Sequence, residues 1–187
     1  MPRLATDVPV VVVQHGAEAR HPFGTVRLAR LGIEGLKVIV ARRDDEGRTQ
    51  CPPCAPQGAA LLYPSADAPV LGVDAPRPRA LVAVDGTWYT ARKVIRDNPW
   101  LQALPRVRVR PPRRGNYRIR RAPDPGRQLS TIEAIVYALR ALGADAEASG
   151  AMLRAFDTMI DRQLAIVAAR NRAGGGTIGS GGTTSEV

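Results

Sequence analysis

Residues 84–101, VDGTWYTARKVIRDNPWL, contain an abrupt change from one structural pattern to another. The apolar run at residues 81–84 is typical of a buried strand, and it ends in Asp-Gly-Thr-Trp, where a helical pattern starts. That pattern predicts a helix over residues 87–97, ended by Asn98-Pro99. A carboxylate, a hydroxyl and a large aromatic side chain therefore follow a strand directly. Open α/β sheets bind ligands at the carboxyl ends of their strands, so this junction is a candidate site.

Apolar runs that end in turn signals recur on both sides of this junction and predict further strands. Four runs are apolar throughout, as expected of parallel strands that are covered on both faces. Two later runs alternate arginine with apolar residues and are expected to expose one face. With helices between the strands, the pattern predicts an α/β fold with a mostly parallel sheet and helices on both faces. The strands are expected at residues 10–13, 36–40, 59–62 and 81–84, around Val107 and Val109, and around Tyr117 and Ile119.

The carboxyl-terminal third of the chain is predicted to be helical. Ser130-Thr131-Ile132-Glu133 has the spacing of a capping box, in which Ser130 and Glu133 each bond the other's backbone amide. The helix that it opens is expected to end at Gly143, and a second helix is expected over residues 145–172. The Gly/Ser/Thr-rich stretch at residues 174–187 has no periodicity and is predicted to be disordered. Length and pattern together predict one domain over residues 1–173.

The net charge of +10 is carried almost entirely by arginine, since only Lys37 and Lys93 are lysines among 27 basic residues. Nine arginines lie in residues 106–127 against one acid, Asp124. Such a concentration favours a polyanionic partner, and the alternative is a solvated strand face. The apolar runs are far shorter than the roughly 20 residues that cross a bilayer. With no charged-then-apolar leader in the sequence, we expect a cytoplasmic protein that does not bind membranes, and a monomer.

Cys51-Pro-Pro-Cys54 supplies the only two cysteines of the chain. Such a pair can form half of a zinc site, but neither a second cysteine pair nor a suitably spaced histidine pair completes it. A redox pair is a further reading, although this one lies in a Pro-rich loop and not at the start of a helix. We therefore predict no metal, and a loop without chemistry is the favoured interpretation.

Several ordered blocks of sequence resemble the DTW-domain family, which is named for the motif present here as Asp85, Thr87 and Trp88. Phe23-Gly24 departs from the family pattern, which has Asn before Thr25, and no zinc ribbon precedes Val10. The other matching blocks are Gln14-His15 with Glu18, Thr25 with Leu28, Tyr63-Pro64-Ser65, Tyr117-Arg118-Ile119-Arg120, and Leu129 through Ala134.

The family is similar to the tRNA-uridine aminocarboxypropyltransferases. The resemblance implies a SPOUT-like fold with a trefoil knot, and transfer of the 3-amino-3-carboxypropyl group of S-adenosylmethionine (SAM) to a uridine N3 in RNA, with tRNA as the expected substrate. Three loops would enclose the SAM, at residues 62–65, 104–107 and 129–134. The residues expected to bind SAM are Leu62, Tyr63, Pro64, Ser65, Thr87, Leu104, Ser130, Thr131, Glu133 and Ala134.

Asp85 and Trp88 are the candidate catalytic residues. Asp85 could take the uridine N3 proton or orient the substrate, and the alternative is that it caps the helix that follows. Trp88 could stack on the target base, or it could fill the core. Two other functions stay open, a SAM-dependent RNA methyltransferase on the same scaffold and a non-catalytic RNA-binding module. The arginines expected to contact RNA phosphates are Arg113, Arg114, Arg118 and Arg120.

Overall fold

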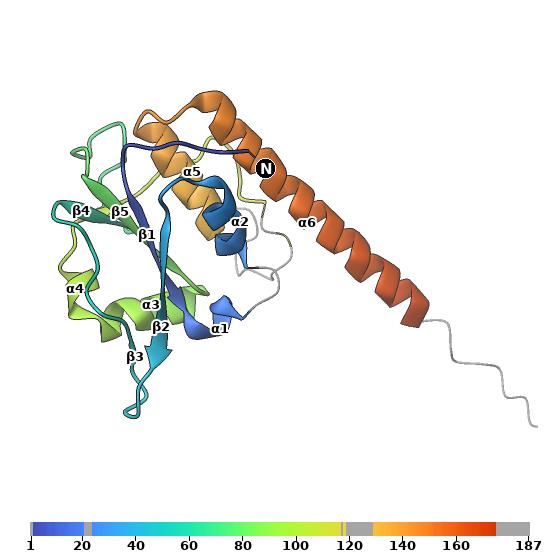
Figure 1. Ribbon diagram of the computed structural model, residues 1–187, viewed down its shortest axis with the longest axis horizontal. Helices are drawn as coiled ribbons and strands as arrows, with labels where there is room; N and C mark the ends of the chain where they lie inside the picture. Colours follow the sequence, from blue (N-terminus) through green and yellow to red (C-terminus); the bar gives the residue numbers. More distant parts are fainter. Residues whose placement is uncertain (1, 21–23, 117, 119–128, 175–187) are drawn as a thin grey trace, which may run out of the picture.

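A central six-stranded sheet carries helices on both of its faces (Figure 1). The computed structural model describes residues 2–20, 24–116, 118 and 129–174. The sheet order is β3-β2-β1-β5-β4-β6. Its strands are β1 (Val10–His15), β2 (Lys37–Arg43), β3 (Thr49–Gln50), β4 (Ala59–Leu62), β5 (Ala80–Asp85) and β6 (Arg106–Val107).

The sheet is mixed, because β3 pairs with β2 in the antiparallel direction while the pairs β2–β1, β1–β5, β5–β4 and β4–β6 are parallel. The α/β class expected from the sequence is confirmed. The antiparallel edge was not predicted, since β3 is only two residues long and follows a polar turn. The strand expected around Tyr117 and Ile119 lies outside the described residues. The knot implied by the resemblance stays a prediction.

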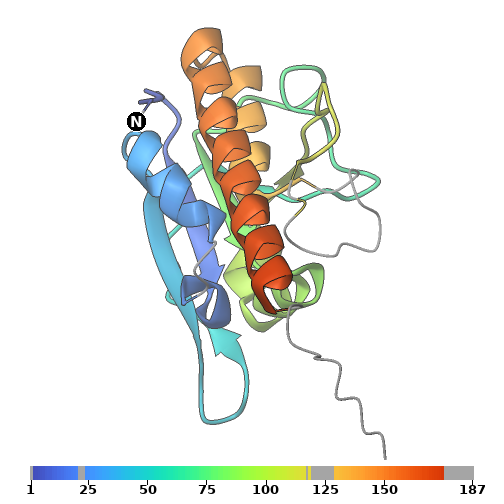
Figure 2. The same ribbon diagram turned by 90° about the vertical axis from the view of Figure 1, so that its right-hand side faces the viewer.

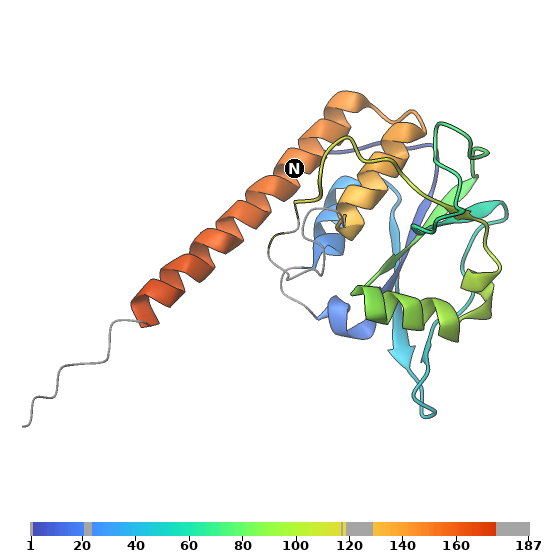
Figure 3. The same cartoon turned by 180° about the vertical axis from the view of Figure 1, so that it is seen from behind.

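The helices form one layer on each face of the sheet. On one face α2, α5 and α6 cover a hydrophobic cluster, and on the other α3 and α4 cover a second one (Figures 2 and 3). Helices α3, α5 and α6 agree with the ranges expected from the sequence, whereas α1 and α4 are single turns. The helices are α1 (Gly16–Ala19), α2 (Thr25–Gly32), α3 (Trp88–Asp97), α4 (Pro99–Gln102), α5 (Thr131–Ala141) and α6 (Ala146–Gly174).

Strand β1 shows why the central strands are apolar throughout. Val10 and Val12 pack into the cluster under α2, α5 and α6, and Val11 and Val13 pack into the cluster under α3 and α4. Because successive side chains point to opposite faces, a strand covered on both sides needs an apolar residue at each position. The polar residues therefore appear only where β1 and β5 end.

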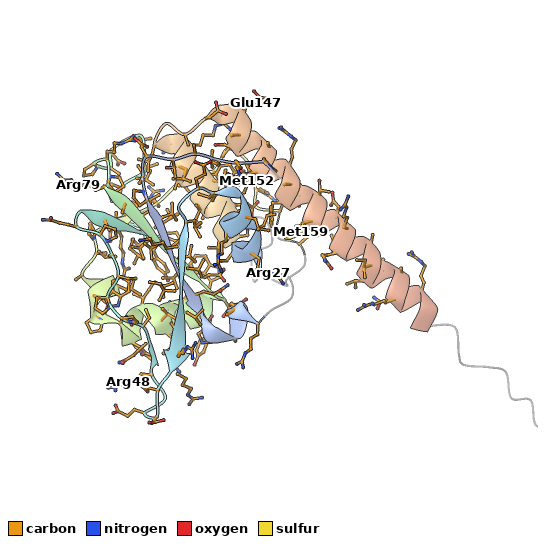
Figure 4. The ribbon with its side chains drawn as sticks, viewed as in Figure 1. Arg27, Arg48, Arg79, Glu147, Met152 and Met159 are labelled. Atoms are coloured by element: carbon orange, nitrogen blue, oxygen red, sulfur yellow. The ribbon has the colours of Figure 1, made fainter. Side chains whose placement is uncertain are left out.

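Helix α6 packs against the body with its first half and extends beyond it with the second (Figure 1). Met152 is fully buried and Met159 partly so, and both lie on the side of α6 that faces the body (Figure 4). A Cβ atom at Gly32 of α2 would overlap the Met152 side chain, so the small residue permits close packing. Farther along, Ile166 and Val167 are exposed. Within the described residues no helix is long and apolar enough to span a membrane.

Candidate active site

Asp85 ends β5 and holds three elements together. It is opposite Gln14 of β1 in the parallel register, so both side chains leave the sheet on the same face. The Gln14 amide nitrogen Nε2 donates to Asp85 Oδ2 at 2.9 Å, and the Thr131 hydroxyl donates to Oδ1 at 2.6 Å. Only 7% of Asp85 is exposed. The carboxylate is thus fixed at the carboxyl end of the sheet, next to the start of α5.

The cap of α3 is Thr87, whose hydroxyl accepts a hydrogen bond from the Thr90 amide at 3.2 Å. The alternative reading of Asp85 as the helix cap is therefore wrong. Thr87 has the preferred extended conformation of an N-cap residue and the side-chain oxygen that the role requires. Asp85 therefore does not cap α3, and its carboxylate bonds Gln14 and Thr131 instead.

A cavity of about 100 Å³ lies beside Asp85, between the ends of β4 and β5 and the start of α5. Gly86, next to Asp85, belongs to its wall, as does Leu129, which precedes the capping box. Of the residues that the sequence assigns to the site, those lining the cavity are Leu62, Tyr63, Pro64, Trp88, Ser130, Thr131 and Ala134. Residues up to 72 positions apart in the chain, Leu62 and Ala134, thus meet at one place.

Four other predicted SAM-binding residues do not line this cavity: Ser65, Thr87, Leu104 and Glu133. Leu104 packs against the hydrophobic cluster under α3 and α4. Glu133 is fully buried and completes the capping box, in which its carboxylate accepts hydrogen bonds from the amide and the hydroxyl of Ser130. It also accepts the Asn116 amide at 2.8 Å. Glu133 therefore holds both Ser130, at the start of α5, and the loop that contains Asn116.

Tyr63 and Trp88 form an aromatic pair at the cavity. Their ring centroids are 6.0 Å apart with the planes at 68°, an edge-to-face arrangement. The Arg106 guanidinium lies 5.3 Å from the Tyr63 ring centroid, within cation–π range. Trp88 is half-buried, so it has both a packed edge and an accessible one. Base stacking and core packing are both compatible with this position.

The predicted RNA-binding arginines divide into two groups. Arg113 donates to the Tyr137 hydroxyl at 3.2 Å and to Asp157 of α6 at 2.8 Å, and both contacts raise the pKa of its guanidinium. Arg118 forms an ion pair with Asp161 of α6. Arg113 and Arg118 therefore both bond α6 and connect the loop that contains them to this helix. Arg114 is exposed, and Arg120 lies outside the described residues.

The two cysteines are half-buried, and Cys51 contacts Asn98. The Cys51 amide donates to Asn98 Oδ1 at 3.0 Å. Burial, with a smaller contribution from Cys54, raises the pKa of Cys51 to about 11, and burial also raises the pKa of Cys54. Both thiols are therefore protonated at neutral pH, which makes them poor nucleophiles. Within the described residues no group of three potential metal-binding side chains was found.

Gln14 is the residue of the site that reasoning from the sequence did not assign. It is 6% exposed and bonds Asp85 directly. The sequence does contain one signal for this contact. Gln14 and Asp85 are polar residues that each follow directly on an apolar run. Their contact depends on the register of two parallel strands 71 positions apart, which the sequence pattern does not specify.

These features define an α/β protein with a candidate ligand site at the carboxyl ends of its parallel strands. The DTW domain model matches residues 1–164, and the chain belongs to the DTW-domain family. The chain is also 31% identical over 171 residues to tRNA-uridine aminocarboxypropyltransferase 2 of Drosophila melanogaster, with 87% of this chain and 67% of that protein covered. No solved structure matches the chain significantly.

Proposed function

We propose that the protein transfers the 3-amino-3-carboxypropyl group of SAM to the N3 atom of a uridine in tRNA. The observation that carries this proposal is the contact of Asp85 with Thr131 beside the cavity, because it joins the DTW motif to the start of α5. The relative described above is a tRNA-uridine aminocarboxypropyltransferase, which supports the same reaction class.

The described residues fit one end of a SAM molecule. Small-molecule sites usually occupy about 300–1,000 Å³, so a cavity of about 100 Å³ accommodates part of the ligand. The start of α5 favours negative charge, which suits the SAM carboxylate. Leu62 and Ala134 supply apolar surface in the same cavity.

Bound SAM supplies an electrophilic carbon on its sulfonium sulfur. The chain must present one of three such carbons to the incoming nitrogen, so placement decides the product. In the proposed role Asp85 accepts the uridine N3 proton as that nitrogen forms its bond to carbon, and the sulfur leaves as a neutral thioether. Gln14 and Thr131 hold the carboxylate in position for this step. Tyr63 or Trp88 provides the ring against which the uridine stacks.

SAM binding tests the proposal before any RNA is known. Isothermal titration should show saturable binding by the wild type and weaker binding by Thr131→Val, which removes the hydroxyl at the cavity. Thr158→Val is the matched control, because Thr158 is exposed on α6 and, among the described residues, its hydroxyl bonds the Arg154 carbonyl of the same helix. No saturable binding by the wild type at millimolar SAM would contradict the proposed function.

A further inference from the structure

A second and larger pocket lies on the other side of Tyr63, against α3. Its volume is about 520 Å³, and Tyr63 lines both this pocket and the smaller cavity beside Asp85. The two spaces therefore share one lining side chain. The residues of the larger pocket that carry charge or an aromatic ring are Tyr63, Tyr89, Arg92, Lys93, Arg96 and Arg106.

The charge of this pocket is one-sided, since four of its lining residues are cations and none is an acid. Within the part of the chain that the structure describes, Arg92, Lys93 and Arg106 form no ion pair with a carboxylate. Arg96 pairs with Asp97, whose other oxygen accepts the Thr49 amide. Within the described residues Arg92 and Arg106 thus lack a carboxylate partner, whereas Lys93 donates to the Gly47 carbonyl and interacts electrostatically with Asp97.

The pocket is built from several elements, so it differs from an ordinary solvated helix face. Tyr89, Arg92, Lys93 and Arg96 are spaced three or four residues apart and form one stripe of α3. Arg106 reaches the pocket from β6, across the sheet, and packs on the Tyr63 ring. Tyr89 is 73% exposed, which leaves a large aromatic ring open to solvent beside these cations.

We propose that this basic pocket binds the RNA strand beside the target nucleotide. The cations of α3 and β6 contact phosphates, and the rings of Tyr63 and Tyr89 stack on unpaired bases. Positive grooves with aromatic side chains are the usual means of holding single-stranded nucleic acid. The assignment rests on the proposed function, because it places the RNA next to the Asp85 cavity through their shared residue Tyr63.

A pair of double variants tests the phosphate contacts. Arg92→Ala with Arg96→Ala removes two charges from α3, and Arg27→Ala with Arg30→Ala removes two exposed charges from α2 on the opposite face of the sheet. Each pair includes one arginine of a last helical turn. Arg96 also pairs with Asp97, so the α3 variant is expected to lose up to about 1 kcal/mol more stability. Figure 4 shows the position of Arg27 on α2. Melting temperatures of both double variants check that each of them folds.

Binding of total tRNA is measured by fluorescence anisotropy at several salt concentrations. The α3 pair should weaken binding about tenfold, and it should reduce the log-log salt slope by about 1.4 to 1.8 if two phosphate contacts are lost. The α2 pair should change neither quantity. Equal weakening by both pairs, an unchanged slope in the α3 pair, or no binding by the wild type would each overturn the proposed RNA site.

Tyr89 separates stacking from charge. Tyr89→Ala should weaken tRNA binding about fivefold or more, the lower end of base stacking, while Tyr89→Phe keeps the ring and should bind like the wild type. Equal affinities of the Ala variant and the wild type would remove Tyr89 from the site.

Activity separates this inference from the proposed function. Wild-type turnover together with unchanged tRNA affinity in the α3 pair would overturn the pocket assignment and leave the transferase intact. The opposite outcome is also informative. If the wild type binds SAM and tRNA but transfers no aminocarboxypropyl group, and the α3 pair loses tRNA affinity, the RNA site is kept and the proposed reaction is contradicted.

Discussion

At the residue scale, the site depends on how Asp85 is held. Its two carboxylate oxygens accept hydrogen bonds from β1 and from the start of α5, so the side chain has a defined orientation. Hydrogen bonds to a carboxylate also stabilise its charged form. In the proposed role, a carboxylate held in this way has a fixed orientation towards a substrate that enters beside Thr131.

Replacing Asp85 by Asn tests this role. The amide has the same shape, and the hydroxyl of Thr131 can turn to accept from it while Gln14 still donates to its oxygen. We expect stability within about 1 kcal/mol of the wild type. SAM affinity should be unchanged, and turnover should fall at least about 100-fold, since a general base is lost. Wild-type turnover in Asp85→Asn would restrict Asp85 to a structural role.

The sequence predicted the position of the Asp85, Thr87 and Trp88 motif better than it predicted the local structural role of each residue. Asp85, Thr87 and Trp88 were expected together at a strand end, and they are together. The division of work between Asp85 and Thr87 was not predicted, because the choice of N-cap depends on where the first helical turn begins. The two ion pairs with α6 at Asp157 and Asp161 involve contacts distant in the chain, and no local pattern indicates them.

At the element scale, α5 is the part that the sequence predicted best. The capping box at Ser130 and Glu133 is a local pattern, and the structure confirms both of its hydrogen bonds. Short elements were missed for a corresponding reason. The four-residue helices α1 and α4 and the two-residue strand β3 are too short to show a period.

The end of α5 depends on a glycine in a loop between β4 and β5. Gly72 has a φ of +76°, and a Cβ atom there would lie 2.9 Å from the Ala141 carbonyl oxygen. Gly72→Ala should therefore lower the free energy of unfolding by more than the roughly 1–2 kcal/mol that the left-handed backbone conformation costs. Denaturant unfolding measures the difference.

Gly35 supplies the control for this prediction, because it has a similar φ of +68° with no atom within 4 Å of the added Cβ. Gly35→Ala should show the backbone cost alone. Equal losses of stability in the two variants would mean that the close approach of Gly72 to α5 contributes nothing.

At the scale of the whole molecule, the two candidate sites lie on opposite faces of the sheet. The face under α2, α5 and α6 carries Asp85 and Gln14, whereas α3 on the other face presents the basic pocket. Tyr63 belongs to both sites. The strongly positive net charge is thus divided, with Arg113 and Arg118 paired to α6 and the α3 cations facing solvent.

The by-product of the reaction tests the central claim most directly. Wild-type protein is incubated with SAM and tRNA, and the small molecules released are identified by chromatography and mass. Transfer of the aminocarboxypropyl group predicts methylthioadenosine in equal amount to the modified uridine. Release of S-adenosylhomocysteine would contradict the account and indicate methyl transfer, and release of neither product would contradict a transferase acting on tRNA.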